Sequence, residues 1–262
     1  MTSSRYMQNI RLIDSHCHLD FDVFDHDRSQ VLQRAQDNNV TDIIIPGTRH
    51  HYWQRITRLT DKHQHLHACY GLHPYWADTH DKQDITKLDE TIARNQPVAL
   101  GECGLDFRTQ QVDKKTQLFF FDAQLTVAEQ HRLPVVIHSV RATEKVIQSI
   151  RKFKNLKGMI HSFSGSLEQA KRLIDMNFYI SISGSVTYAN AKTMKEVVKA
   201  IPLTSLLLET DAPDQADAKN HGNRNEPAYL VNTLSTIAQL REETLTDIAR
   251  QTSLNAKDLF AI

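Results

Sequence analysis

The stretch IDSHCHLD, from Ile13 to Asp20, is the feature that most constrains this chain of 262 residues. Apolar residues lead into two histidines separated by one residue, with an aspartate on either side. Side chains at positions i and i+2 of a β-strand point to the same face. We therefore expect His16 and His18 to converge on one point and Cys17 to face the other way. Two imidazoles placed in this way at the end of a strand can form half of a divalent-metal site.

Short runs rich in Val, Ile or Leu alternate with segments of helical periodicity along the whole chain. Most of these runs close on Gly, Pro or Asp, as buried parallel strands do. The eight runs begin at Arg11, Val40, His65, Pro97, Leu133, Lys157, Phe178 and Leu203. Eight strand–helix pairs predict an α/β fold, a (β/α)8 TIM barrel in which residues 1–262 form a single domain. A doubly wound open sheet shows the same alternation, and alternation by itself does not separate the two.

The segments between the runs carry apolar residues at helical spacing. The segment KKTQLFFFDAQLTVAEQHR places on one stripe Leu118, Phe121, Leu125 and Ala128. Ser166, with Glu168 in the following turn, predicts the N-cap of another helix. The final segment, from Pro227 onward, is also predicted to be helical and to cover the last flank of the barrel.

The neutral charge balance of the chain argues against a protein that binds nucleic acid or a membrane through a large net positive charge. Lysine and arginine (31 residues) equal aspartate and glutamate (31 residues), so no global field attracts nucleic acid or an anionic membrane. Three cysteines are an odd and sparse set, which argues against a disulfide framework. The amino-terminal segment MTSSRYMQNIR lacks the apolar core of a signal peptide, and no run approaches the length of a membrane span. We expect a cytoplasmic protein with no membrane partner.

Metal-binding residue types recur where the predicted strands end, which is where barrels of this kind place their functional groups. The residues are His16, His18, His73, Glu102, His138, His161 and Asp211. A ring of imidazoles with two carboxylates suits two divalent cations, because one mononuclear site takes only about three or four protein ligands. Glu209 would point the same way as Asp211, and both a supporting contact and no role at all remain open for it.

The chain has 14 histidines, and we do not expect all of them to belong to a site. His63, His65 and His67 enter the third run from its amino end, away from the candidate site, and we interpret them as structural. His50 and His51 follow the second run, where they could contact substrate or face solvent, and we favour solvent.

These motifs resemble, in order and over nearly the whole chain, the TatD family of metal-dependent deoxyribonucleases among the amidohydrolase-like barrels. The matching segments are IDSHCHLD, GLHPYW, GECGLD, PVVIHS, HSFSGS, LLLETDAP and NRNEP. The resemblance implies a TIM barrel with a dinuclear metal centre. One metal would be held by His16, His18, Glu102 and Asp211. Glu102 would bridge to a second metal, whose other ligands would be His138 and His161.

The resemblance also implies the roles of individual residues in catalysis. Asp211 and Glu102 would be the catalytic residues, with Asp211 accepting the proton of the attacking water. His73 would lie beside the metals and contact the substrate. The family usually follows the histidine of strand five with Ser-Arg, whereas here Val140 intervenes before Arg141. If that arginine binds phosphate, Arg141 must reach the substrate from one position later.

Two close cations suit the hydrolysis of a phosphodiester, because they activate water and neutralise charge on the attacking and leaving oxygens. Tyr75 and Trp76 follow His73 at the expected mouth, where they can stack a base or pack the loop onto the rim. The predicted function is a deoxyribonuclease that acts on single-stranded DNA or frayed 3′ ends as an exonuclease and works as a monomer.

The cofactor prediction is two divalent metal ions, for which histidine-rich ligation suits Zn²⁺, Mn²⁺, Ni²⁺ or Co²⁺ and the family resemblance adds Mg²⁺. Two other classes of function stay open. One is a hydrolase of a small ester, amide or phosphate on the same metal site. The other is a protein that binds metal or nucleic acid without catalysis.

Overall fold

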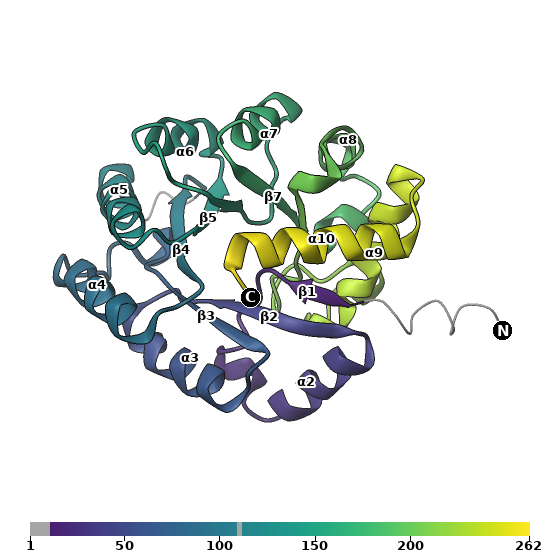
Figure 1. Ribbon diagram of the computed structural model, residues 1–262, viewed down its shortest axis with the longest axis horizontal. Coiled ribbons are helices and arrows are strands. Elements are labelled where there is room, and N and C mark those ends of the chain that lie inside the picture. The colour runs from purple at the N-terminus through teal and green to yellow at the C-terminus, as the bar shows by residue number, and fades with distance from the viewer. Residues whose placement is uncertain (1–10, 109–111) are drawn as a thin grey trace.

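The computed structural model describes residues 11–108 and 112–262; the amino-terminal segment MTSSRYMQNI, considered above for a signal peptide, lies outside them. Eight parallel strands form one sheet in the order of the sequence (Figure 1). They are β1 (Leu12–Asp14), β2 (Val40–Pro46), β3 (Leu66–Tyr70), β4 (Ala99–Asp106), β5 (Val135–Val140), β6 (Gly158–Ile160), β7 (Phe178–Ile182) and β8 (Leu206–Leu208).

Hydrogen bonds just beyond the strands join the first strand to the last. The backbone N–H of Ser15 donates to the carbonyl of Leu208 at 3.0 Å, and that of Asp211 donates to His16 at 2.9 Å. The sheet is thus a nearly closed barrel, and of the two predicted architectures the (β/α)8 barrel is confirmed.

Helices surround the barrel in the order of the chain (Figure 1). The α-helices are α2 (Arg28–Asp37), α3 (His50–Lys62), α4 (Gln83–Asn95), α5 (Lys114–His131), α6 (Thr143–Ile150), α7 (Leu167–Ile174), α8 (Lys192–Ala200), α9 (Leu230–Arg241) and α10 (Leu245–Phe260). Short 3-10 helices include η2 (Asp22–Phe24), η3 (Pro74–Trp76), η4 (Gly184–Thr187), η5 (Leu203–Ser205), η6 (Ala218–Asn220) and η7 (Pro227–Tyr229). Ser166 caps α7 as predicted, and it forms a capping box with Gln169.

The last helix crosses the amino-terminal end of the barrel (Figure 1). Ala256, Leu259 and Phe260 of α10 pack in one buried cluster with side chains that seven strands turn inward, Ile13, Ile44, Cys69, Ala99, Val136, Met159 and Leu207. The prediction that the final segment covers the last flank is therefore wrong for α10, since only α9 lies beside α8 on the flank. With one end of the barrel closed by apolar packing, polar groups are left to gather at the other.

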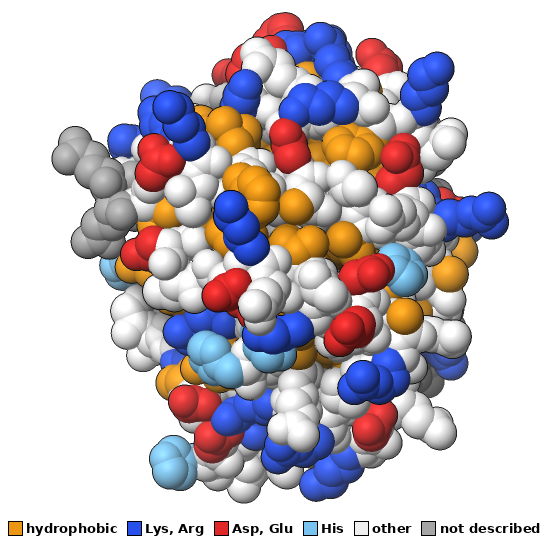
Figure 2. Space-filling view, turned by 90° about the vertical axis from the view of Figure 1, so that its left-hand side faces the viewer, with side chains coloured by type: hydrophobic (Ala, Val, Ile, Leu, Met, Phe, Trp, Pro, Cys, Tyr) orange, Lys and Arg blue, Asp and Glu red, His pale blue; other side chains and the backbone are white. Residues whose placement is uncertain are grey.

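The three cysteines, Cys17, Cys69 and Cys103, are buried free thiols, which agrees with the prediction that no disulfide framework exists. On the face shown in Figure 2, Lys and Arg side chains are interspersed with Asp and Glu side chains, in keeping with the neutral charge balance. Within residues 11–108 and 112–262, no helix combines the length and the apolar character that a membrane crossing needs.

Candidate metal centre

Glu102, on β4, lies at the centre of five imidazole rings and is buried. Two rings face its Oε2 atom: Nε2 of His16 is 3.2 Å away and Nε2 of His18 is 3.3 Å away. Three rings face its Oε1 atom: His73 Nε2 (3.1 Å), His138 Nδ1 (2.9 Å) and His161 Nε2 (3.0 Å). The two oxygens of one carboxylate thus divide the histidines of the site into two groups.

Asp211, in the loop after β8, belongs to the first group. Its Oδ1 atom lies 3.4 Å from Nε2 of His16 and 3.6 Å from Nε2 of His18. The backbone of Asp211 has a φ of 57°, a left-handed conformation that a residue other than glycine rarely adopts unless its surroundings hold it. The structure therefore brings the predicted ligands of the first metal to one point.

The donor set fits divalent cations. Both oxygens of Glu102 are buried, and none of their close contacts to imidazole nitrogens has the geometry of a hydrogen bond. Pairs of imidazole nitrogens also face each other, at 3.2 Å between His16 and His18 and at 3.0 Å between His138 and His161. Converging nitrogen lone pairs around a bridging carboxylate are what borderline cations such as Zn²⁺ coordinate.

The protonation of the centre follows from this arrangement. Burial by itself would raise the pKa of Glu102, but the imidazoles of His73, His161 and His16 lower it to well below its ordinary value, so this group is a carboxylate. Burial lowers the pKa of His73 to about 4. The Nδ1 atom of that neutral ring accepts a hydrogen bond of 3.0 Å from the backbone of Tyr75, which leaves the proton on Nε2, facing Glu102.

A second carboxylate of β4, Asp106, supports one of the histidines. Its Oδ2 atom lies 3.1 Å from Nε2 of His138 and accepts a hydrogen bond from it, so Nδ1 is the ring atom that faces Glu102 and is placed to bind a cation. Asp106 was not among the site residues predicted from the sequence. A signal for it existed, because strand alternation places residues 102, 104 and 106 on one face of β4.

Glu209 is also a supporting residue, and the question that the sequence left open is answered by its contacts. It is buried and accepts hydrogen bonds from the backbone of Ser162 at 2.6 Å and from the hydroxyl of Ser181 at 2.5 Å. Its Oε1 atom lies 3.3 Å from Nδ1 of His161. A carboxylate on the far side of a metal-ligating imidazole orients the ring.

Gln215 is a polar neighbour of the site that our sequence analysis did not find. Its Nε2 atom donates a short hydrogen bond to Oδ2 of Asp211. Its Oε1 atom accepts hydrogen bonds from three hydroxyls, those of Ser162 (2.6 Å), Ser183 (2.7 Å) and Ser185 (2.9 Å). Three O–H donors fix the orientation of the amide, so that its N–H₂ group must face Asp211. No local pattern marks such a residue, because it lies in a loop.

Two sets of contacts hold the loop that carries Asp211. The carboxylate of Asp14, on β1, accepts hydrogen bonds from the backbone (2.9 Å) and the hydroxyl (2.5 Å) of Thr210. The side-chain amide of Asn225, in the NRNEP segment, donates to the carbonyls of Thr210 (2.8 Å) and Asp214 (2.7 Å). The NRNEP segment is thereby tied directly behind the candidate ligand.

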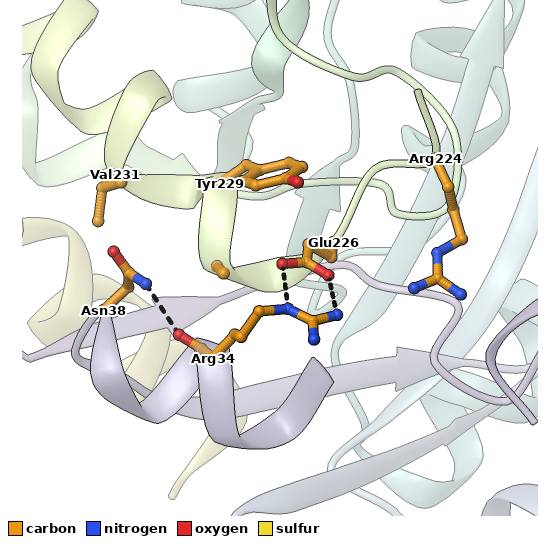
Figure 3. A pocket seen from close by; sticks show the side chains of 7 residues that line it. Arg34, Asn38, Arg224, Glu226, Tyr229 and Val231 are labelled. Atoms are coloured by element: carbon orange, nitrogen blue, oxygen red, sulfur yellow. Dashed lines mark hydrogen bonds and ion pairs between the residues drawn. The ribbon is translucent and has the colours of Figure 1, made fainter. Parts of the chain in front are cut away.

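Ion pairs anchor the same segment to α2, beside a surface pocket of about 460 Å³ (Figure 3). Figure 3 shows the guanidinium of Arg34 facing both carboxylate oxygens of Glu226, at 2.8 and 2.6 Å. Arg224 forms a second two-pronged pair with Asp27, at 2.8 and 2.6 Å. These two-pronged pairs tie the NRNEP segment to the start of α2.

A cleft of about 680 Å³ opens over the histidines at the carboxyl ends of the strands. Its walls include the predicted substrate-binding residues His73, Tyr75 and Trp76. Tyr75 is 45% exposed, whereas the ring of Trp76 carries the guanidinium of Arg49 at 4.5 Å. The ring of Tyr75 is thus more accessible to a stacking base than the ring of Trp76, which Arg49 partly covers.

Other walls of the cleft combine apolar and hydroxyl side chains. They are formed by Phe21, Thr48, Ser139, Val140, Ser162, Ser164, Ser185 and Met194. Val140 lies on the wall, but the predicted phosphate ligand Arg141 is exposed and is not among the described residues that line the cleft.

Of the histidines that we interpreted as lying outside the site, His67 forms an ion pair of 2.9 Å with Asp42 near the amino ends of the strands. His50 and His51 are exposed at the start of α3. Within the described residues, groups of three or more side chains that could hold a metal ion occur around Glu102 and the neighbouring Glu209. None lies elsewhere in this part of the chain.

Residues 13–261 match the model of a family described as TatD related DNase. The uncharacterized metal-dependent hydrolase YjjV of Escherichia coli (strain K12) is 35% identical over 255 residues, which cover 96% of this chain and 98% of YjjV. The uncharacterized metal-dependent hydrolase YabD of Bacillus subtilis (strain 168) is 37% identical, over 96% of this chain and 99% of YabD.

A relative with a named activity, the 3′-5′ ssDNA/RNA exonuclease TatD of Pantoea ananatis, is 32% identical over 91% of this chain and 95% of its own. The crystal structure of YjjV from Escherichia coli superposes with a TM-score of 0.93 over 97% of this chain and 99% of YjjV.

Proposed function

Because this chain belongs to the family of TatD related DNases and is a metal-dependent hydrolase, we propose that it cleaves the phosphodiester bonds of DNA with two divalent cations. The observation that carries the proposal is the division of the histidines between the two oxygens of Glu102. In this assignment one cation would be held by His16, His18 and Asp211. The other would be held by His138 and His161, and Glu102 would be a ligand of both.

Two cations in these positions would lower the pKa of a water molecule and neutralise the negative charge that phosphate oxygens develop during hydrolysis. The residues of the chain supply the rest. Asp211 offers Oδ1 to the cation and accepts the proton of the attacking water, with Gln215 holding its carboxylate in place. His73 presents a protonated Nε2, which makes it a hydrogen-bond donor to a phosphate oxygen rather than a metal ligand.

We propose single-stranded DNA or frayed 3′ ends as the substrate. The proposal is supported by the name of the Pantoea relative, by the neutral charge of the chain and by the confined cleft. A protein that tracks a duplex needs many Lys and Arg contacts, and each neutralised phosphate steepens the salt dependence of binding. Here Tyr75 can stack a base while the cleft admits a loose strand more readily than a duplex.

The test compares substrates on the chelated protein after each cation is added back. The substrates are a single-stranded oligonucleotide labelled at the 5′ end, the same strand in a blunt duplex, closed circular duplex, and a panel of small carboxylic esters, amides and phosphate monoesters. A ladder that shortens from the 3′ end of the single strand is the expected result. Rapid nicking of the circle would overturn the exonuclease assignment, and turnover confined to the small compounds would favour the alternative hydrolase.

Salt dependence gives a second measure. With only two or three phosphates held, binding of a short single strand with turnover blocked should show a log–log salt slope shallower than about −2.5. A slope of −5 or steeper would contradict the proposal, because it requires a basic track along the surface. The protein is expected to elute as a monomer in the same buffer.

A further inference from the structure

Arg108 is a positively charged residue in the wall of the cleft. It follows β4 and is the one Lys or Arg among the described residues that line the cleft. Its Nε atom lies 3.2 Å from both oxygens of Asp106, and its Nη2 atom donates to Oδ2 at 2.7 Å. No described residue accepts a hydrogen bond from its Nη1 atom, and the side chain is 54% exposed. One edge of the guanidinium is therefore held by Asp106, and the other has no partner among residues 11–108 and 112–262.

The buried carboxylate of Asp106 gives this arginine a fixed place relative to the metal centre. Its Oδ2 atom accepts hydrogen bonds from both Arg108 and Nε2 of His138. An arginine held by two parallel bonds to a buried carboxylate has lost most of its rotamer freedom, so binding a ligand costs little further ordering. The hydrogen bonds to Asp106 raise the pKa of Arg108, and the negative charge of Asp211, which lines the same cleft, adds a smaller contribution.

The contacts of Arg108 indicate which phosphate it binds. Its guanidinium is connected to Glu102 only through Asp106 and His138. Because two residues stand between them in this series of contacts, we assign Nη1 to a phosphate other than the one seated at Glu102. In an oligonucleotide the next charged group along the strand is the neighbouring phosphate.

Arg141 offers a natural comparison. It follows Val140, its backbone has a φ of 51°, and it is exposed and not among the described residues that line the cleft. An exposed arginine without a fixed partner contributes little to the recognition of a single phosphate.

We propose that Arg108, positioned by Asp106, binds the phosphate adjacent to the scissile phosphate of a single strand. The inference rests on the proposed function for the identity of the ligand, an oligonucleotide with at least two phosphates. It assigns to Arg108 the role that the family resemblance suggested for Arg141. The residue would distinguish an oligonucleotide from a substrate with one phosphodiester group.

The experiment has a binding arm that does not depend on turnover. Thymidine 3′,5′-bisphosphate and thymidine 3′-monophosphate are titrated by calorimetry into the metal-loaded parent protein, R108A, R108K and R141A. The parent and R141A should bind the bisphosphate more tightly than the monophosphate, and R108A should lose about tenfold in affinity for the bisphosphate only. R108K should retain part of the preference for the bisphosphate, because lysine keeps the positive charge but lacks the bidentate guanidinium group. Equal affinities of the parent for the two ligands, or an equal loss in R141A, would overturn the proposal.

The kinetic arm uses bis(p-nitrophenyl) phosphate, which has one phosphodiester group, and the dinucleotide pTpT, which has a second phosphate. R108A should raise KM for pTpT about tenfold and affect the turnover of bis(p-nitrophenyl) phosphate less than that of pTpT, whereas R141A should leave both activities close to those of the parent. Loss of both activities with loss of metal would mean that Arg108 acts only by supporting Asp106 and His138, which contradicts the proposal. If the parent hydrolyses no nucleotide at all, the proposed function fails, while the binding arm still decides the role of Arg108.

Discussion

Gln215 donates a hydrogen bond from Nε2 to the Oδ2 atom of Asp211, the aspartate of the LLLETDAP motif, whose other oxygen faces His16 and His18. Each oxygen of this carboxylate thus has a separate task. Oδ1 faces the metal position, and Oδ2 is held by an amide whose own orientation three serine hydroxyls determine.

Replacing Gln215 by methionine should therefore reduce catalysis without abolishing metal binding. The loss of a hydrogen bond to a charged group corresponds to about 1.5–3 kcal/mol, or roughly a 10- to 100-fold decrease in kcat. KM should change little, because Gln215 does not contact the phosphate in the proposed assignment. The measurement is steady-state kinetics of Q215M. The control variant is Ser164→Ala, which removes a hydroxyl that lines the same cleft. A rise in KM with kcat unchanged would mean that Gln215 binds substrate instead.

Glu102→Gln tests the bridge. A neutral amide cannot balance two cations, so the purified variant should lose more than one equivalent of metal per chain and all measurable hydrolysis. His138→Ala is the matched control, because it removes a ligand from one group only and should weaken one cation. Metal analysis by mass spectrometry decides the matter, and two full equivalents in Glu102→Gln would remove Glu102 from the bridging role.

Asp211→Asn separates proton transfer from binding. The amide keeps an oxygen for the cation but cannot accept a proton, so metal and substrate binding should largely persist. Turnover should fall by roughly 10²–10⁴, the usual effect of losing a general base. Hydrolysis at near the parent rate would show that another group accepts the proton.

Asp20 should make the metal-free protein less stable as the pH rises. Both of its oxygens are buried without a hydrogen-bond partner in the described chain, and burial raises its pKa to about 6. The folded state therefore holds this proton more tightly than the unfolded state, whose aspartate pKa is about 3.9. The contribution to stability is complete below about pH 4 and is lost as the pH rises through about 6, a change of about 3 kcal/mol.

The measurement is urea unfolding in the presence of a chelator, at pH 4.5 and pH 8. Asp20→Asn should be more stable than the parent at pH 8 and similar at the lower pH, whereas Asp61→Asn, on the exposed surface of α3, should follow the parent. A variant that is less stable than the parent at pH 8 would indicate that the ionised carboxylate makes a favourable interaction in the fold.

The convergence of the candidate metal ligands was predictable because each of these residues lies at the carboxyl end of an apolar run. Strand alternation predicts that His16 and His18 converge, and the structure places their Nε2 atoms 3.2 Å apart. The same rule, applied along β4 from Glu102, would also have found Asp106. These inferences succeed because a parallel barrel gathers the ends of all its strands at one edge, so that position within a strand determines position in the molecule.

The tertiary structure alone decided three other matters. Gln215 and Arg108 reach the site from loops, whose backbone direction depends on contacts with distant segments rather than on a local period. The helical pattern of the last segment indicates that α10 has an apolar face, but not that Ala256, Leu259 and Phe260 close the end of the barrel. The periodicity of the sequence predicts that the apolar face of α10 is buried. It does not predict which surface buries that face, because the hydrophobic effect is not directional and the packing of the whole chain decides the partner.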